Sequence, residues 1–200
     1  MKQFLIFLGV IATSNLTYGQ EFSFEMYFED SLGNKDTLIM GYDILATDTI
    51  DSIFGEINIV SVPLDSVFGV RITNEWYSGG YETFHTKKQI VSYNCVSWPY
   101  TIVTVDIKTK NWPVTASWDD TVFYDTCRNG SVFTSVNPGG WWDTGSPSNL
   151  DRVQLKHQNQ VTFSIQVETY SNGSFNDNYA YSNGIGDTLS VFWVGFGDLY

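Results

Sequence analysis

A run of carboxylate and amide side chains between residues 30 and 56 is the first group in this sequence that could do chemistry. It holds seven such residues: Asp30, Asn34, Asp36, Asp43, Asp48, Asp51 and Glu56. Calcium takes about six to eight oxygen ligands from side chains of these types, so Asp30, Asn34 and Asp36 are candidate ligands. The spacing matches no EF-hand loop, and solvated acids in turns between strands are the alternative.

Aromatic side chains beside turns form a second candidate site. Trp141 and Trp142 directly follow a Pro-Gly-Gly turn, Asp143 comes next, and Trp76 lies just before another glycine pair. Aromatic faces can stack on sugar rings, and loops at the rim of a sheet stack are where such sites lie. The pattern predicts a carbohydrate-binding platform of Trp76, Trp141, Trp142 and Asp143. Packing of the same rings over an open end of the sheets is the alternative.

Motifs of nucleophilic or metal-dependent catalysis are not found. The sequence has no Gly-x-Ser-x-Gly elbow and no His-Glu-x-x-His motif. A glycosidase needs two facing carboxyl groups about 5–10 Å apart, and nothing pairs the glutamates that are available: Glu25, Glu29, Glu75, Glu82 and Glu168. We therefore expect no catalytic residues and no enzymatic activity, with a sandwich-fold glycosidase as the remaining enzyme hypothesis.

The two cysteines, Cys95 and Cys127, are the only ones in the chain. In an oxidising compartment an even count of two favours a disulfide, and a pair of buried thiols is the alternative. Closing this loop would stabilise the fold by about 3–4 kcal/mol if chain entropy dominates.

Charge and the amino terminus indicate where the chain works. The 200 residues carry a net charge of −12, which opposes binding to nucleic acid and to anionic membranes. Lys2, the apolar run Phe4–Ala12 and small residues before Gln20 predict a signal peptide over residues 1–19. No later stretch is long enough to span a bilayer. We expect a protein that is secreted or at the cell surface, or periplasmic if export stops after the Sec step.

Hydrophobic alternation with period two predicts the elements that position these residues. It is clearest over Phe22–Phe28, Val103–Ile107 and Val161–Val167, where each strand should have one face in the core and one in water. Shorter strands are expected at Thr37–Tyr42, Val67–Thr73, Lys88–Tyr93, Pro113–Trp118 and Val132–Val136. Leu189–Phe196 is apolar on both faces, which predicts a central or covered strand.

Helical periodicity is almost absent, and Ile44–Phe54 is the only place expected to hold a short helical turn. Turns rich in Gly and Asn separate the strands. The sequence therefore predicts an all-β chain with a single domain over residues 20–200, and two modules that meet near Tyr93 are the alternative. The expected architecture is an antiparallel β-sandwich, jelly-roll or Ig-like, of about nine or more strands.

Two stretches of the sequence resemble a known family. The first runs from Asp30 through Ala46-Thr47-Asp48 and Gly55-Glu56 to Arg71, and the second is Pro113–Asp119. They resemble the β-sandwich domain of secreted proteins from bacteria that use type IX secretion, which usually precedes a C-terminal sorting domain. The resemblance implies export, a β-sandwich and residence outside the cell or at its surface. Because no sorting domain follows, we expect either export by the Sec step alone or a longer parent protein.

The tripeptide Asp-(Ser/Thr)-apolar occurs seven times. It resembles the O-glycosylation acceptor of exported proteins in the same bacteria, which implies sugar on these hydroxyls: Ser31, Thr37, Thr49, Ser52, Ser66, Thr121 and Thr188. Such glycans add bulk and solvation. The alternative is turn chemistry, in which Asp and Ser or Thr precede a strand and the apolar residue begins it.

These observations favour a secreted or cell-surface, non-catalytic β-sandwich module for adhesion, structure or ligand binding. A carbohydrate-binding module with the tryptophan platform is the alternative. The expected partners are a carbohydrate or a cell-surface protein, and no cofactor is expected apart from the calcium considered above.

Overall fold

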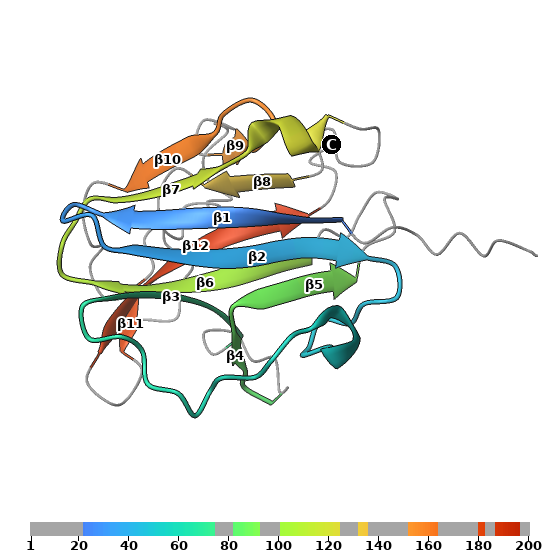
Figure 1. Ribbon diagram of the computed structural model, residues 1–200, viewed down its shortest axis with the longest axis horizontal. Helices are drawn as coiled ribbons and strands as arrows, with labels where there is room; N and C mark the ends of the chain where they lie inside the picture. The colour runs from blue at the N-terminus through green and yellow to red at the C-terminus, as the bar shows by residue number, and fades with distance from the viewer. Residues whose placement is uncertain are drawn as a thin grey trace, which may run out of the picture.

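The chain folds as two β-sheets in two layers, as the computed structural model in Figure 1 shows. The structure describes residues 22–74, 82–92, 101–124, 132–135, 152–163, 180–182 and 187–196. The strands of the first sheet lie in the order β10-β7-β1-β2-β5. Their bounds are β1 Phe22–Asp30, β2 Lys35–Asp43, β5 Lys88–Ser92, β7 Val114–Trp118 and β10 Gln160–Phe163.

The second sheet has the order β4-β3-β6-β12-β8-β9, with β11 also paired to β12. Its strands are β3 Phe68–Thr73, β4 His85–Thr86, β6 Thr101–Thr109, β8 Val132–Ser135, β9 Arg152–Gln154, β11 Ala180–Ser182 and β12 Thr188–Phe196. Two short 3-10 helices, η1 (Ser52–Phe54) and η2 (Asp120–Phe123), complete the described elements. The sequence therefore forms an all-β protein, as its alternation predicts.

Strand pairing is antiparallel in every described pair but one. β1 and β2 form a hairpin in register Phe22↔Tyr42 to Glu29↔Lys35, closed by a turn in which Gly33 has φ +82°. The exception is β5, which runs parallel to β2. The chain reaches β5 directly from β4, so it passes from the second sheet to the first at Lys87.

One hydrophobic core joins the two sheets. Along β1 the side chains alternate strictly between buried and exposed, which directs four large apolar residues inward. The ring of Phe28 meets Phe192 of β12 edge-on, with centroids 5.7 Å apart, and Phe24 lies 6.4 Å from Phe196. Because β1 and β12 belong to different sheets, these contacts set the two layers face to face.

The expected strands are confirmed at β1, β2, β3, β5, β6, β7, β8 and β12, with ends that differ by a few residues. β12 lies between β6 and β8 within its sheet, as a strand apolar on both faces requires. The helical turn expected within Ile44–Phe54 is η1. For the alternation beginning at Val161, the structure describes the strand only to Phe163.

The expectation that β6 has a solvent face is wrong. Asp106 is 1% exposed, and Arg71, which pairs with it on β3, is 5% exposed. Arg71 is covered because its guanidinium donates hydrogen bonds to carbonyl groups of residues 59–63. Arg71 is thus buried under the segment that links β2 to β3, whereas Thr104 of β6 is half-buried.

Candidate binding surface on the β2–β3 loop

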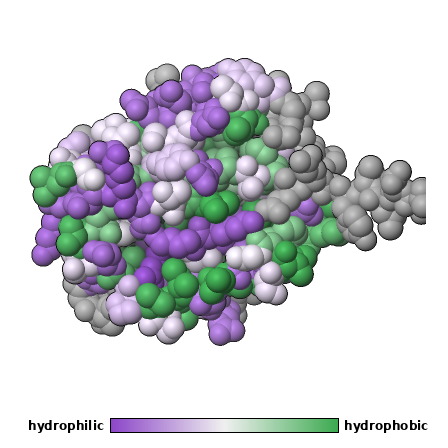
Figure 2. Space-filling model, viewed as in Figure 1, coloured by the Kyte–Doolittle hydropathy of each residue, from purple (hydrophilic) through white to green (hydrophobic). Residues whose placement is uncertain are grey.

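The segment of residues 44–67, here called the β2–β3 loop, carries most of the exposed apolar side chains that the structure describes. Among the described residues ten large hydrophobic side chains are exposed, and seven lie in this loop: Ile44, Leu45, Ile53, Ile57, Val60, Val62 and Val67. Figure 2 shows hydrophobic side chains gathered on the lower part of one face, where the loop runs in Figure 1. Concentrated exposed apolar surface of this kind marks interaction sites.

The loop is held to the edge of the first sheet by two carboxylates. Glu56 is 3% exposed, and its Oε1 accepts a hydrogen bond from the N–H of Ile90 in β5 at 2.6 Å. Asp48 Oδ1 accepts from the N–H of Ser92 at 3.2 Å. β5 is an edge strand of its sheet, so these carboxylates satisfy backbone donors that would otherwise face solvent.

The same loop is held to the second sheet through β4 and β3. Ile59 donates its N–H to the carbonyl of His85 at 2.7 Å, and the N–H of His85 donates to Asn58 Oδ1 at 3.2 Å. Arg71 of β3 donates to the carbonyls of Val62, at 2.5 Å, and Pro63, at 2.7 Å. The loop therefore bridges the edges of both sheets, and its exposed apolar side chains sit on an anchored backbone.

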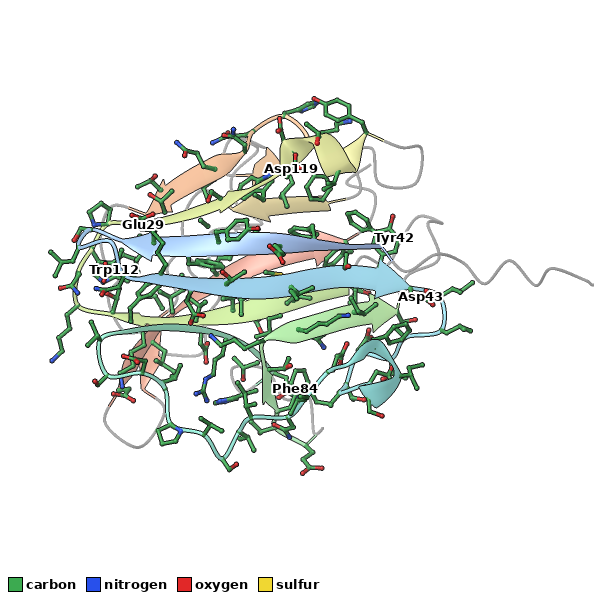
Figure 3. The ribbon with its side chains drawn as sticks, in the orientation of Figure 1. Glu29, Tyr42, Asp43, Phe84, Trp112 and Asp119 are labelled. Carbon is green, nitrogen blue, oxygen red and sulfur yellow. The ribbon has the colours of Figure 1, made fainter. Side chains whose placement is uncertain are left out.

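Between the loop and the start of β4 lies an open pocket of about 370 Å³. Its lining residues come from both segments: Thr49, Ile50, Asn58, Glu82, Thr83 and Phe84. Figure 3 shows Phe84 in the lower part of the molecule, beside the loop. Glu29 lies away from it, at the C-terminal end of β1. Phe84 is held by a hydrogen bond from its N–H to Asn74 Oδ1 at 2.9 Å.

Negative charge dominates the loop. Residues 44–67 contain Asp48, Asp51, Glu56 and Asp65 and no Lys, Arg or His. Elsewhere carboxylates form ion pairs, such as Asp36 with Lys87 at 2.5 Å and Asp187 with Lys108 at 2.8 Å. Asp51 and Asp65 instead accept backbone N–H groups of Thr47 and Val67. These bonds leave the negative charge of the loop in place.

Burial raises the pKa of Glu56 above its ordinary value. Hydrogen bonds from the backbone N–H groups of Ile90 and Asp51 lower this pKa, and so does the positive charge of Lys88. The negative charge of the Asp51 side chain raises it. The effect of burial is the largest of these, because the charged form loses its hydration. Glu56 is therefore the buried titratable group that fixes the loop to β5.

The predicted calcium ligands are only partly brought together. Asp30 and Asn34 meet, but it is the amide nitrogen of Asn34 that donates to both carboxylate oxygens, at 3.0 and 3.1 Å. Asp36 instead accepts hydrogen bonds from Lys87 Nζ and from the N–H of Val70. No cluster of three or more His, Cys, Asp or Glu able to hold a metal ion occurs among the residues that the structure describes. Calcium binding stays a prediction.

The predicted tryptophan platform and the cysteines lie outside the described residues, namely Trp76, Trp141, Trp142, Asp143, Cys95 and Cys127. Trp118, at the end of β7, is 5% exposed and donates its Nε1–H to the carbonyl of Leu155 at 2.9 Å. Glu25 and Glu29 are exposed on β1, as the alternation predicts.

The hydroxyls of the repeated tripeptide are mostly accessible. Five are exposed: Ser31, Thr49, Ser52, Ser66 and Thr121. Thr37, within β2, is half-buried. The side chain of Thr188 lies outside the description, although its backbone begins β12.

No family model, curated protein or solved structure matches the chain. Within the described residues no helix is long and apolar enough to cross a membrane.

The loop surface was not predicted as a site from the sequence. Its isoleucines and valines are the residue types that normally enter cores, so composition gave no sign of exposure. The available signal was length, because 24 residues separate β2 from β3. Ordered loops longer than about 12–15 residues are uncommon and usually functional.

Proposed function

We propose that this chain is an exported, non-catalytic β-sandwich module, jelly-roll or Ig-like, that binds a partner at the bacterial surface through the β2–β3 loop. The observation that carries the proposal is the concentration of exposed apolar side chains on this loop, with Ile53 73% and Ile57 68% exposed. Export rests on the expected signal peptide, and the resemblance to domains of type IX secreted proteins agrees with it.

Two features support binding over a purely structural role. Exposed apolar side chains on an anchored loop lose little conformational freedom when a partner covers them, which favours affinity. The loop also tethers both sheet edges, so it presents these side chains from a fixed base. A loop that served only as a connection would not need 24 residues.

Retention on cells tests the proposal. The labelled chain from Gln20 onward is applied to cells of the producing bacterium from which its gene has been deleted, beside an I53S/I57S double variant. Truncating an apolar anchor at an interface commonly costs more than about 1 kcal/mol, so we expect retention of the double variant to fall at least about fivefold.

Leu32→Ser is the matched control, because Leu32 is 74% exposed in the β1–β2 turn, outside the loop. Its retention should equal that of the unmodified chain. Equal retention of all three proteins, or none of the unmodified chain, would contradict the proposal. A glycan array read by tryptophan fluorescence distinguishes the carbohydrate-binding alternative, which requires quenching that I53S/I57S leaves unchanged.

A further inference from the structure

The pocket beside the β2–β3 loop combines two apolar lining residues, Ile50 and Phe84, with one carboxylate, that of Glu82. We propose that it receives a lysine or arginine side chain from an extended basic segment of the partner protein, an inference that rests on the proposed function. The segment's apolar residues would then cover Ile53 and Ile57, on the same loop as Thr49, Ile50 and Asn58 of the pocket.

The walls suit the methylene stem of such a side chain. Ile50 is half-buried and packs against the core, and Phe84 is 4% exposed. Lysine and arginine bury their stems along apolar surface and keep the charged head in a polar environment. Phe84 is too deeply buried to offer its ring face to a sugar, which needs an open aromatic face for stacking.

The polar groups suit a cation attached to a peptide backbone. Glu82 is exposed, and no described residue forms an ion pair with it. Its carboxylate is available for a charge-assisted hydrogen bond. Asn58 Oδ1 already accepts the N–H groups of Val60 and His85, at 3.0 and 3.2 Å. The Asn58 amide therefore presents its N–H donors, which fit a carbonyl of the incoming segment.

The charge of the surrounding loop favours the same partner. Its four carboxylates come with no basic residue, and Lys87 and Arg71 nearby are held by Asp36 and by loop carbonyls. A surface of one sign attracts and orients a partner of the opposite sign. An acidic segment would be repelled, and a neutral one would leave Glu82 without an ion pair among the residues that the structure describes.

Fluorescence anisotropy with defined peptides tests the pocket. The probe is a labelled eight-residue peptide of alternating lysine and leucine, and its matched control carries acetyl-lysine, which keeps the stem and removes the charge. At about 150 mM salt, where long-range attraction is screened, we expect the acetylated peptide to bind at least about tenfold more weakly.

Two charge-removing variants distinguish binding at the pocket from general electrostatic attraction to the acidic chain. Glu82→Gln and Glu29→Gln change the net charge equally, but Glu29 lies at the far end of β1 (Figure 3). We expect E82Q to weaken binding of the lysine peptide about five- to tenfold, and E29Q to leave it within about twofold. Thr83→Lys, which adds a competing cation at the pocket wall, should also weaken binding. Both glutamates are exposed, so E82Q and E29Q should keep the melting temperature of the unmodified chain.

Equal effects of E82Q and E29Q, or equal binding of the lysine and acetyl-lysine peptides, would overturn the inference. The cell-retention assay distinguishes failure of this inference from failure of the proposed function. If the unmodified chain is retained through Ile53 and Ile57 but binds no lysine peptide, the pocket inference fails and the binding role stands.

Discussion

Asp30 shows how one buried carboxylate can organise a hairpin turn. It is 4% exposed and its two oxygens accept hydrogen bonds from Leu32, Asn34, Thr109 and Asn111. Burial alone would raise its pKa, but the hydrogen bonds from Asn34, Asn111 and Leu32 outweigh that effect and lower the pKa to about 2. The turn after β1 is thereby tied to the end of β6.

We predict that Asp30→Asn destabilises the fold by about 2 kcal/mol at neutral pH. The amide loses the charge that strengthens these hydrogen bonds and turns an N–H₂ group toward other donors. For a chain of this size the melting temperature should fall by about 4–8 °C. Asp65→Asn is the control, because Asp65 is exposed and its side chain accepts one N–H, from Val67. A loss no larger than that of D65N would refute this role.

The lowered pKa of Asp30 also predicts a pH dependence. A carboxyl whose pKa is lower in the folded state stabilises the fold above its unfolded pKa, and the benefit disappears as pH falls from about 4 to about 2. After allowance for solvent screening, we expect a loss of about 1–2 kcal/mol over that range. Denaturant titrations at several pH values measure it. A D30N protein with the same slope would show that other acids are responsible.

At the scale of elements, η2 closes one end of the core. Its residue Phe123 is 1% exposed, with ring centroids 5.7 Å from Phe22 and 5.0 Å from Phe24 of β1. Asp119 begins the helix by accepting the N–H of Thr121 at 2.9 Å. The side chain of Phe123 thus fills space between β1 and the 3-10 turn.

We predict that Phe123→Ala costs about 3–5 kcal/mol, because it removes a large buried ring and leaves a cavity. Its neighbour supplies the control. Tyr124 is 64% exposed and donates its hydroxyl to the carbonyl of Lys156, so Tyr124→Ala should cost less than about 1 kcal/mol. Urea denaturation of both variants measures the difference, and similar losses would show that η2 is not part of the core.

The anchoring of the β2–β3 loop predicts a second pH effect, of opposite sign. Because the pKa of Glu56 is raised in the folded state, the fold binds a proton there more readily than the unfolded chain. This contribution to stability grows as pH falls through the folded pKa and is lost as pH rises through it.

The variant Glu56→Gln should lack that pH-dependent contribution. Glu56→Ala, which removes the acceptor altogether, should speed amide hydrogen exchange at Ile90, whose N–H bonds to Glu56, while E29Q leaves that exchange unchanged. Unaltered exchange at Ile90 in E56A would show that the loop does not protect the edge of β5.

Some elements follow from the sequence and others do not, for physical reasons. In β1 four large apolar residues alternate with polar ones, so a shift of one residue would expose the whole set, and the strand is unambiguous. Asp106 of β6 looked solvated because a sequence does not show that it pairs with Arg71, which a distant loop covers. The parallel pairing of β2 with β5 likewise depends on a partner 45 residues or more away and leaves no local mark.

At the scale of the whole molecule, the apolar residues of the repeated tripeptide differ in burial, with Ile50 and Val122 half-buried between the two extremes. Leu38 and Leu189 are fully buried in β2 and β12, so there the apolar residue is explained by its strand. Leu32, Ile53 and Val67 are 74%, 73% and 51% exposed, and none of them lies in a strand. For these three the fold does not require an apolar residue after the hydroxyl.

That division turns the expected glycosylation into a specific prediction. If the tripeptide is recognised by a modifying enzyme, sugar should be found first on Ser31, Ser52 and Ser66, whose hydroxyls are exposed and whose apolar neighbours are accessible to that enzyme. Thr37 should stay bare, because it is half-buried and paired with Tyr27 within the sheet.

Peptide mass spectrometry of the protein from its own host measures occupancy at each site, with the S31A/S52A/S66A variant as the control for assignment. Sugar on Thr37 with bare serines would mean that accessibility does not select the sites. Bare peptides throughout would mean that the repeat reflects turn chemistry alone. Modification at Ser52 would also place a polar, bulky group beside Ile53, so glycosylated protein should be retained on cells less well than protein made without the modification.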